Sequence, residues 1–190
     1  MEKVTIKLHR PDLKEKVFFF LSGLIISIPF TFFFEQLSDS LVVTLPSFYA
    51  NVLALTVFAP VIEEFAKAYP IFYRHGETER SIVTLGLFVG LGFGIFEFFS
   101  YTLFLGVPVL IRLPGIFFHA ATTSVIAFGI AKKQPVGFYL LAVTLHFLNN
   151  LFALDDLLWL TGGILTIAMT LLLAVYLYQK TQEVVIRENF

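Results

Sequence analysis

The chain has 190 residues and a formal net charge of −1; 57% of its residues are hydrophobic and only 14% are charged. Because a soluble domain ordinarily carries about 25% charged residues, this composition predicts an integral membrane protein in contact with the lipid bilayer. Nucleic-acid binding is excluded, since no basic stripe or tail is present and the 24 phenylalanines lie in hydrophobic runs. The absence of cysteine excludes disulfides, a thiolate nucleophile and cysteine-based metal sites.

Six apolar runs predict an all-α, polytopic membrane helix bundle with about six transmembrane helices. The runs cover residues 17–34, 43–72, 82–106, 113–131, 137–154 and 157–179. Each contains a stretch of about 17 to 25 residues, the length that crosses a hydrocarbon core about 30 Å thick. The expected connections are residues 35–40, 74–80, 107–108, 132–135 and 155–156. We therefore expect a single transmembrane domain at 17–180, a short charged cytoplasmic arm at 1–16 and a cytoplasmic tail at 181–190.

The positions of Lys and Arg predict the orientation, because short cytoplasmic loops hold most of the positive charge. Of the 13 basic residues, Arg112 alone falls in a segment expected outside when both termini are cytoplasmic, and Lys67 lies within a span. Both termini are therefore expected in the cytoplasm. A prokaryotic cytoplasmic membrane fits a small multi-pass chain of this kind.

Strongly polar side chains lie near the middle of four predicted spans. They are Glu63, Glu64, Glu97, His119 and His146. Each falls within about 10 Å of the middle of its span at 1.5 Å rise per residue. Lys67 lies on the same helical face as Glu63, and Asn150 lies on the same face as His146. Because a charge in hydrocarbon costs about 2.5–3.5 kcal/mol or more, we expect these groups to share one cavity with a function.

The residues present limit the chemistry of such a cavity. The chain has no Gly-x-Ser-x-Gly elbow and no His-Glu-x-x-His motif, and all four Asp lie in tails or expected connections. A serine triad, an aspartyl pair and the common zinc-protease helix are therefore not expected. What remains is a carboxylate that takes a proton from water, with His and Asn positioned to stabilise a developing oxyanion.

Four motifs follow one another on separate predicted helices. They are Glu-Glu-x-x-Lys at 63–67, Phe-x-x-x-Glu at 93–97, His119, and His-x-x-x-Asn at 146–150. This ordered set resembles the PrsW family of membrane proteases, relatives of the CAAX prenyl endopeptidases. Ala68 and Glu97 stand where the CAAX-type branch usually has Arg and His, which favours the PrsW branch. Phe98 stands where many PrsW-like sequences have Asn.

The resemblance implies an intramembrane endopeptidase that cleaves a peptide bond in or near a transmembrane segment of a membrane protein. A transmembrane anti-sigma factor is the substrate linked with the family's namesake. Glu63 or Glu64 would activate water, and His146 and Asn150 would orient the water or stabilise the oxyanion. Glu97 and His119 would complete the site. The substrate, the scissile bond and the oligomeric state stay open.

Two questions of chemistry also stay open at this point. The cofactor is expected to be either none or one divalent metal such as zinc, with Glu97, His119 and His146 as candidate ligands beside Glu63 or Glu64. The metal-free scheme is preferred by analogy with the CAAX-type relatives; it needs a protonated Glu or Lys67 to offset negative charge. The competing functions are a proton- or ion-coupled transporter with a relay through the same three candidate ligands, and a non-catalytic membrane adaptor.

Overall fold

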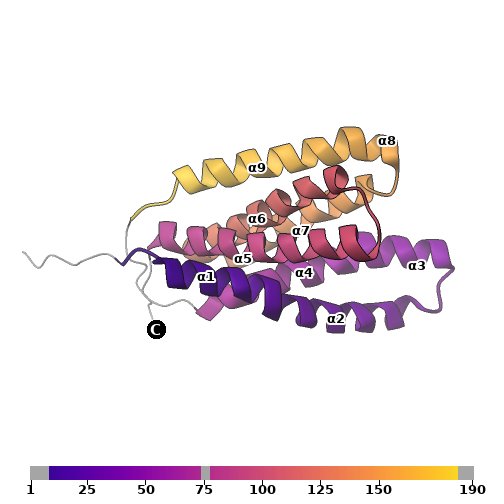
Figure 1. Ribbon diagram of the computed structural model, residues 1–190, viewed down its shortest axis with the longest axis horizontal. Coiled ribbons are helices and arrows are strands. Elements are labelled where there is room, and N and C mark those ends of the chain that lie inside the picture. The colour runs from indigo at the N-terminus through magenta and orange to yellow at the C-terminus, as the bar shows by residue number, and fades with distance from the viewer. Residues whose placement is uncertain (1–8, 74–77, 184–190) are drawn as a thin grey trace, which may run out of the picture.

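The computed structural model describes residues 9–73 and 78–183. Parts of the predicted arm and tail, residues 1–8 and 184–190, lie outside the described residues. Within the described part, six helical spans are long and apolar enough to cross a membrane, which confirms the predicted all-α bundle (Figure 1). The spans are Leu13–Val42, Ser47–Tyr73, Glu79–Phe104, Val109–Ala131, Pro135–Phe152 and Asp156–Gln179.

Short irregular turns divide most of the spans into consecutive elements. The first three spans consist of α1 (Leu13–Leu21), η1 (Ser22–Ile26) and α2 (Ser27–Val42); α3 (Ser47–Leu53), η2 (Ala54–Phe58), α4 (Ala59–Ala68) and η3 (Tyr69–Tyr73); and α5 (Glu79–Phe99) and η4 (Ser100–Phe104). The last three consist of α6 (Val109–Ala131); α7 (Pro135–Phe152); and α8 (Asp156–Leu158), η5 (Trp159–Gly163) and α9 (Ile164–Gln179). The turn η3 is a 3₁₀-helix, and the other four η elements are π-helical turns.

Local sequence explains where the spans begin. Asp12 caps α1 by accepting from the Glu15 amide, and the Glu15 side chain accepts from the Asp12 amide in return, which forms a capping box. Thr78 caps α5, because its side-chain oxygen accepts a hydrogen bond from the Ser81 backbone amide. Pro135 is the first residue of α7, a position whose backbone N–H makes no hydrogen bond within the helix, so a proline costs nothing there.

Two π-helical turns lie just before prolines inside long spans. The turn η1 ends three residues before Pro29, and η2 ends two residues before Pro60. A proline inside a helix removes one hydrogen bond and pushes against the preceding turn, and one extra residue in that turn relieves both effects. Both spans therefore continue across their prolines with a local change of direction.

The predicted connection at 35–40 is wrong, because α2 continues through it to Val42. The carboxylates of Glu35 and Asp39 had suggested a loop, but no glycine or proline interrupts this stretch. Both acids therefore lie one turn apart on a helix. Arg112, expected in an outer segment, lies in the first turn of α6.

Helix α5 lies at the centre of the bundle because its glycines allow close contact with two neighbours. A Cβ atom at Gly90 would lie 2.6 Å from Ala120 Cα of α6, and one at Gly94 would lie 2.8 Å from Ile116 Cα. On another face, a Cβ at Gly92 would lie 3.0 Å from the backbone nitrogen of Leu24 in η1. These glycines therefore pack helices against each other, as small residues commonly do in membranes.

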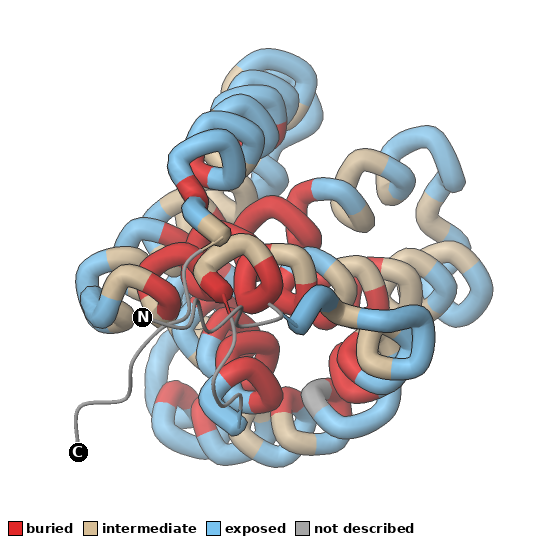
Figure 2. The backbone as a smooth tube through the Cα atoms, turned by 90° about the vertical axis from the view of Figure 1, so that its left-hand side faces the viewer, coloured by how far each residue is buried: buried red, intermediate tan, exposed pale blue. Residues whose placement is uncertain are grey.

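The burial pattern fits a bundle that faces lipid. Buried residues gather at the centre and exposed residues lie on the outer faces (Figure 2). Many of the exposed residues are large and apolar, such as Phe33, Leu103 and Leu172. Helix α9, at the top of both views, is mostly exposed and packs mainly on α6. The first and last described residues lie at one end of the bundle, where Arg10 and Glu183 form an ion pair of 3.3 Å.

Candidate active site

Helix α4 carries the charged cluster into the interior of the bundle. Glu63 is 8% exposed, and Glu64 and Lys67 are 0% exposed. The Lys67 ammonium donates to Glu64 Oε1 at 2.7 Å, one helical turn away. A buried charge is tolerated only when it is paired and hydrogen-bonded, so this ion pair explains how α4 can hold both groups.

Lys67 also links α4 to α6. Its ammonium donates to His119 Nδ1 at 2.8 Å and to Thr122 Oγ1 at 3.4 Å, and it lies 5.0 Å from the centre of the Phe93 ring. With Glu64, these contacts use the three donors that an ammonium possesses. Because His119 accepts at Nδ1, its hydrogen lies on Nε2, which donates to Glu97.

Polar contacts continue in both directions from this centre. On one side, Glu97 Oε1 accepts from Arg112 Nη2 at 2.9 Å. On the other side, His146 Nδ1 lies 2.8 Å from Glu64 Oε1. Since Glu64 accepts from the Lys67 ammonium and is ionised, His146 Nδ1 is the donor, which leaves Nε2 as an acceptor.

Glu63 differs from every other carboxylate in this network. Its Oε2 atom is buried and has no hydrogen-bond partner among the described residues. His146 Nε2 is 3.8 Å from it, which is beyond hydrogen-bond distance. Glu64 Oε2 is also unpartnered, but Glu64 is sealed from solvent and already holds two partners through Oε1. Within this network, Glu63 is thus the acid that both lines open space and has an unpartnered carboxylate oxygen.

Two cavities adjoin Glu63. One, of about 400 Å³, lies between α2 and α5–η4, and the other, of about 360 Å³, is bounded by α2, η2, α6 and the end of α7. The residues that line both are Glu35, Glu63, Glu97 and Tyr101. Both cavities lie toward the end of the bundle opposite the described termini. Glu63 therefore borders the open space of both cavities.

The remaining predicted site residue, Asn150, lies at the wall of the smaller cavity. Its Nδ2 donates to the Leu55 carbonyl oxygen of η2 at 2.9 Å. The amide has a second N–H that this bond does not use. Asn150 thus lines the same cavity as Glu63, and its hydrogen bonds go to the backbone of η2 and to Asn149.

Three side chains are arranged to hold a metal ion. Ligand atoms of Glu63, His119 and His146 lie within 4.8 Å of one another, and all three residues are buried. Glu97, a candidate ligand from the sequence, is not in this group, because its carboxylate binds His119 and Arg112. Two imidazoles and a carboxylate form a common donor set for catalytic zinc.

Sequence reasoning missed three charged residues of this region, Glu35, Asp39 and Arg112. The sequence offered a clue for Arg112 and for Glu35. Arg112 was the one basic residue expected outside, and Glu35 follows a run of three phenylalanines without a helix breaker. Glu35 and Asp39 were assigned to a connection, and Arg112 was counted in an outer segment just before the run at 113–131. The structure brings them to the same cavity as Glu63.

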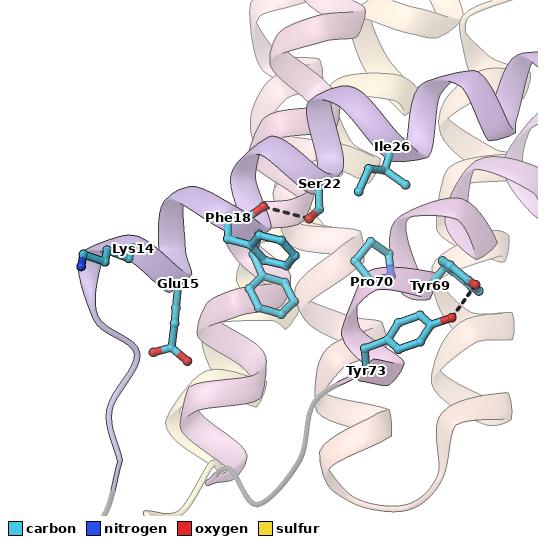
Figure 3. A pocket seen from close by; sticks show the side chains of 9 residues that line it. Lys14, Glu15, Phe18, Ser22, Ile26, Tyr69, Pro70 and Tyr73 are labelled. Carbon is cyan, nitrogen blue, oxygen red and sulfur yellow. Dashed lines mark hydrogen bonds between the residues drawn. The ribbon is translucent and has the colours of Figure 1, made fainter.

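A separate cavity of about 540 Å³ lies between α1 and η3, near the end of the bundle that carries the described termini (Figure 3). Phe18, Ile26 and Pro70 face it, and the Tyr69 and Tyr73 hydroxyls are hydrogen-bonded beside it. None of the predicted site residues lines it. This cavity is therefore not part of the charged network.

Comparison with known proteins gives one clear result. Neither the curated proteins nor the solved structures include a match. A family model described as the PrsW family intramembrane metalloprotease matches residues 13–178, which includes every site residue discussed above. With six membrane-spanning helices, the chain is a multi-pass membrane peptidase. It belongs to the PrsW family of intramembrane metalloproteases.

Proposed function

We propose that this protein hydrolyses a peptide bond in or near a transmembrane segment of a membrane protein, with Glu63 as the base that activates water. The observation that carries this proposal is that Glu63 lines both cavities and has a buried carboxylate oxygen without a hydrogen-bond partner among the described residues. We further propose a prokaryotic cytoplasmic membrane with both termini in the cytoplasm, in accord with the distribution of Lys and Arg.

Glu64 is suited to positioning and not to proton transfer with substrate. It lines neither cavity and is 0% exposed, and its Oε1 atom is held by Lys67 and His146. Glu63 lines both cavities. A general base must reach the proton that it removes, so geometry assigns this role to Glu63.

His146 is oriented to assist Glu63. Its Nδ1 donates to Glu64, so its Nε2 accepts and faces Glu63 at 3.8 Å. A water molecule between these two groups has one acceptor for each of its hydrogens. Its oxygen lone pair is then free to attack a carbonyl carbon.

The reaction needs only groups that line the cavities or touch those that do. Water oxygen attacks the scissile carbonyl carbon while Glu63 takes a proton from the water, and the carbonyl oxygen becomes an oxyanion. The second N–H of Asn150 is available to stabilise that oxyanion. Glu63 then gives its proton to the leaving nitrogen as the C–N bond breaks, which yields a new carboxyl terminus and a new amino terminus.

The residues present also fit a divalent metal ion. Glu63, His119 and His146 would hold it, and the unpartnered Glu63 oxygen provides a free ligand atom. When bound, such an ion acts as a Lewis acid on water or on the scissile carbonyl. His119 would have to release either Lys67 or Glu97, because both of its ring nitrogens are engaged. Lys67 already supplies a positive charge to this site.

The divergence of α2 from α5 supports access from the bilayer. Helix α1 and η1 pack closely on α5, whereas α2 packs mainly on α4. Beyond the contact at Gly92, the space between α2 and α5 is the larger cavity at Glu63, and its walls include Ile28, Phe32 and Phe96. An apolar opening of this kind suits a transmembrane substrate, which reaches the site without leaving lipid.

The test uses the purified protein in proteoliposomes with a panel of single-span membrane peptides, analysed by mass spectrometry. We expect cleavage by the wild type at a defined bond and none by Glu63→Gln. A pH-sensitive dye inside the same vesicles reports the competing transport function. Proton flux without cleavage of any peptide would replace the peptidase proposal by the transporter, and neither activity would favour the adaptor.

A further inference from the structure

Helix α2 presents two acids to the active-site cavities that belong to none of the four sequence motifs. Glu35 lines both cavities, and Asp39, one turn further along α2, lines the smaller one. Glu63 and Glu97 line the same space. Four carboxylates thus surround a volume large enough for side chains of a substrate.

Positive charge does not balance these acids. Among the described residues, no Lys or Arg forms an ion pair with Glu35, Asp39 or Glu63. Arg112 lines the smaller cavity, but its guanidinium binds Glu97 at 2.9 Å and lies 3.7 Å from the centre of the Tyr101 ring. Acidic side chains therefore outnumber basic ones in the wall of this cavity.

Glu63 is an independent sign of a missing ligand. More than nine-tenths of this residue is buried, and its Oε2 atom has no hydrogen-bond partner among the described residues, while the residue itself lines both cavities. Buried carboxylate oxygens normally have a donor, because an unpaired one loses the hydration that it had in water. A donor that occupies either cavity would lie beside the Glu63 side chain.

We propose that the substrate carries a Lys or Arg side chain next to the scissile bond, and that Glu35 and Asp39 bind this cationic group while the bond lies at Glu63. This inference rests on the proposed peptidase function and names the substrate class of the same site. Glu35 and Asp39 are specificity-determining residues, and they take no part in proton transfer.

The shape and chemistry of the walls favour a long cationic side chain over a small cation. The larger cavity has apolar walls that include Ile28, Phe93 and Phe104, and its acidic side chains include Glu35. A Lys or Arg side chain has the same order of groups, an apolar stem followed by a charged head. It can therefore lie along the apolar wall with its head between the α2 carboxylates.

The test measures binding and cleavage separately. The probes are synthetic peptides with one Leu/Ala transmembrane span, in which a single Lys is moved residue by residue and then replaced by Met or Glu. Binding is measured by fluorescence on His146→Ala, because His146 lines neither cavity. We expect the best Lys peptide to bind about tenfold more tightly than its Met counterpart, in the range of a partly buried ion pair.

Charge-removing variants identify the groups responsible. The combined change Glu35→Gln with Asp39→Asn, made in the same background, should reduce the preference for Lys to about threefold or less. The matched control is Asp156→Asn, an exposed acid at the same end of the bundle that lines neither cavity; it should keep the preference. The thermal unfolding midpoint of each variant shows whether it is folded.

Three results would overturn the inference. The first is equal binding of the Lys and Met peptides. The second is a preference for the Lys peptide that persists in the Glu35→Gln, Asp39→Asn variant. The third is near-stoichiometric bound metal, measured by mass spectrometry, that is present in the wild type and absent from that variant. Cleavage of all peptides without charge preference refutes only this inference. Preferential binding of the Lys peptides without any cleavage refutes the peptidase proposal and leaves the cationic site standing.

Discussion

The Lys67–Glu64 ion pair allows a quantitative prediction, because both side chains are fully buried. Lys67→Met removes an ammonium that donates to Glu64, His119 and Thr122. It leaves the Glu64 carboxylate with His146 alone. Breaking a buried pair by removing one partner costs about 3–5 kcal/mol, so we expect a loss of this size in the free energy of unfolding.

A double-mutant cycle separates the pair from the loss of the lysine side chain. In Lys67→Met with Glu64→Gln no charge stays uncompensated, so this double variant should regain about 2 kcal/mol or more relative to Lys67→Met. The assay is reversible unfolding in mixed detergent micelles. Lys132→Met is the control, because Lys132 and Glu79 also lie 2.7 Å apart but the Lys132 side chain is 31% exposed. This variant should lose about 1 kcal/mol or less in the free energy of unfolding. Equal losses for Lys67→Met and Lys132→Met would refute the reasoning.

Three further predictions concern packing, catalysis and metal. Gly90→Ala places a methyl group 2.6 Å from Ala120 Cα, so thermal unfolding should show a loss of about 1–3 kcal/mol, whereas Gly115→Ala, with nothing within 4 Å, should cause none. Asn150→Ala should lower kcat by about 10²-fold with little change in KM in the peptide assay, because it removes a donor at the cavity wall; an unchanged kcat would contradict that role. Metal bound to the purified protein should be lost in His146→Ala and retained in Glu97→Gln by mass spectrometry, because His146 and not Glu97 belongs to the converging ligand set; the opposite pattern would assign the metal to another site.

The bundle could be predicted because the lengths of the apolar runs match the membrane thickness. Each predicted run corresponds to one helical span, and five of the six runs differ from those spans by a few residues at their ends. The first is the exception: charge at Glu35 and Asp39 was treated as the end of a helix, but charge alone does not end a helix without a glycine or proline. Because of that mistake, Glu35 and Asp39 were not recognised as residues that line the cavities.

The residues of the site could be predicted from their polarity, but their separate roles could not. Glu63 and Glu64 are adjacent and identical in type, and only the structure shows that one borders open space while the other is enclosed. Contacts between helices distant in sequence are equally hidden, such as Arg112 with Glu97. Spacing along a helix places residues on one face, whereas the partners of that face depend on how the helices pack.

The distinction between Glu63 as base and Glu64 as positioning group is the central claim, and the two Gln variants test it most directly. Cleavage of one transmembrane peptide and the free energy of unfolding are measured for Glu63→Gln and Glu64→Gln side by side. Glu63→Gln should lose about 10³-fold or more in kcat with stability within about 1 kcal/mol of the wild type. Glu64→Gln should lose stability as well, because Lys67 is then a buried charge without its carboxylate. Full cleavage by Glu63→Gln, with activity lost only in Glu64→Gln, would contradict the assignment.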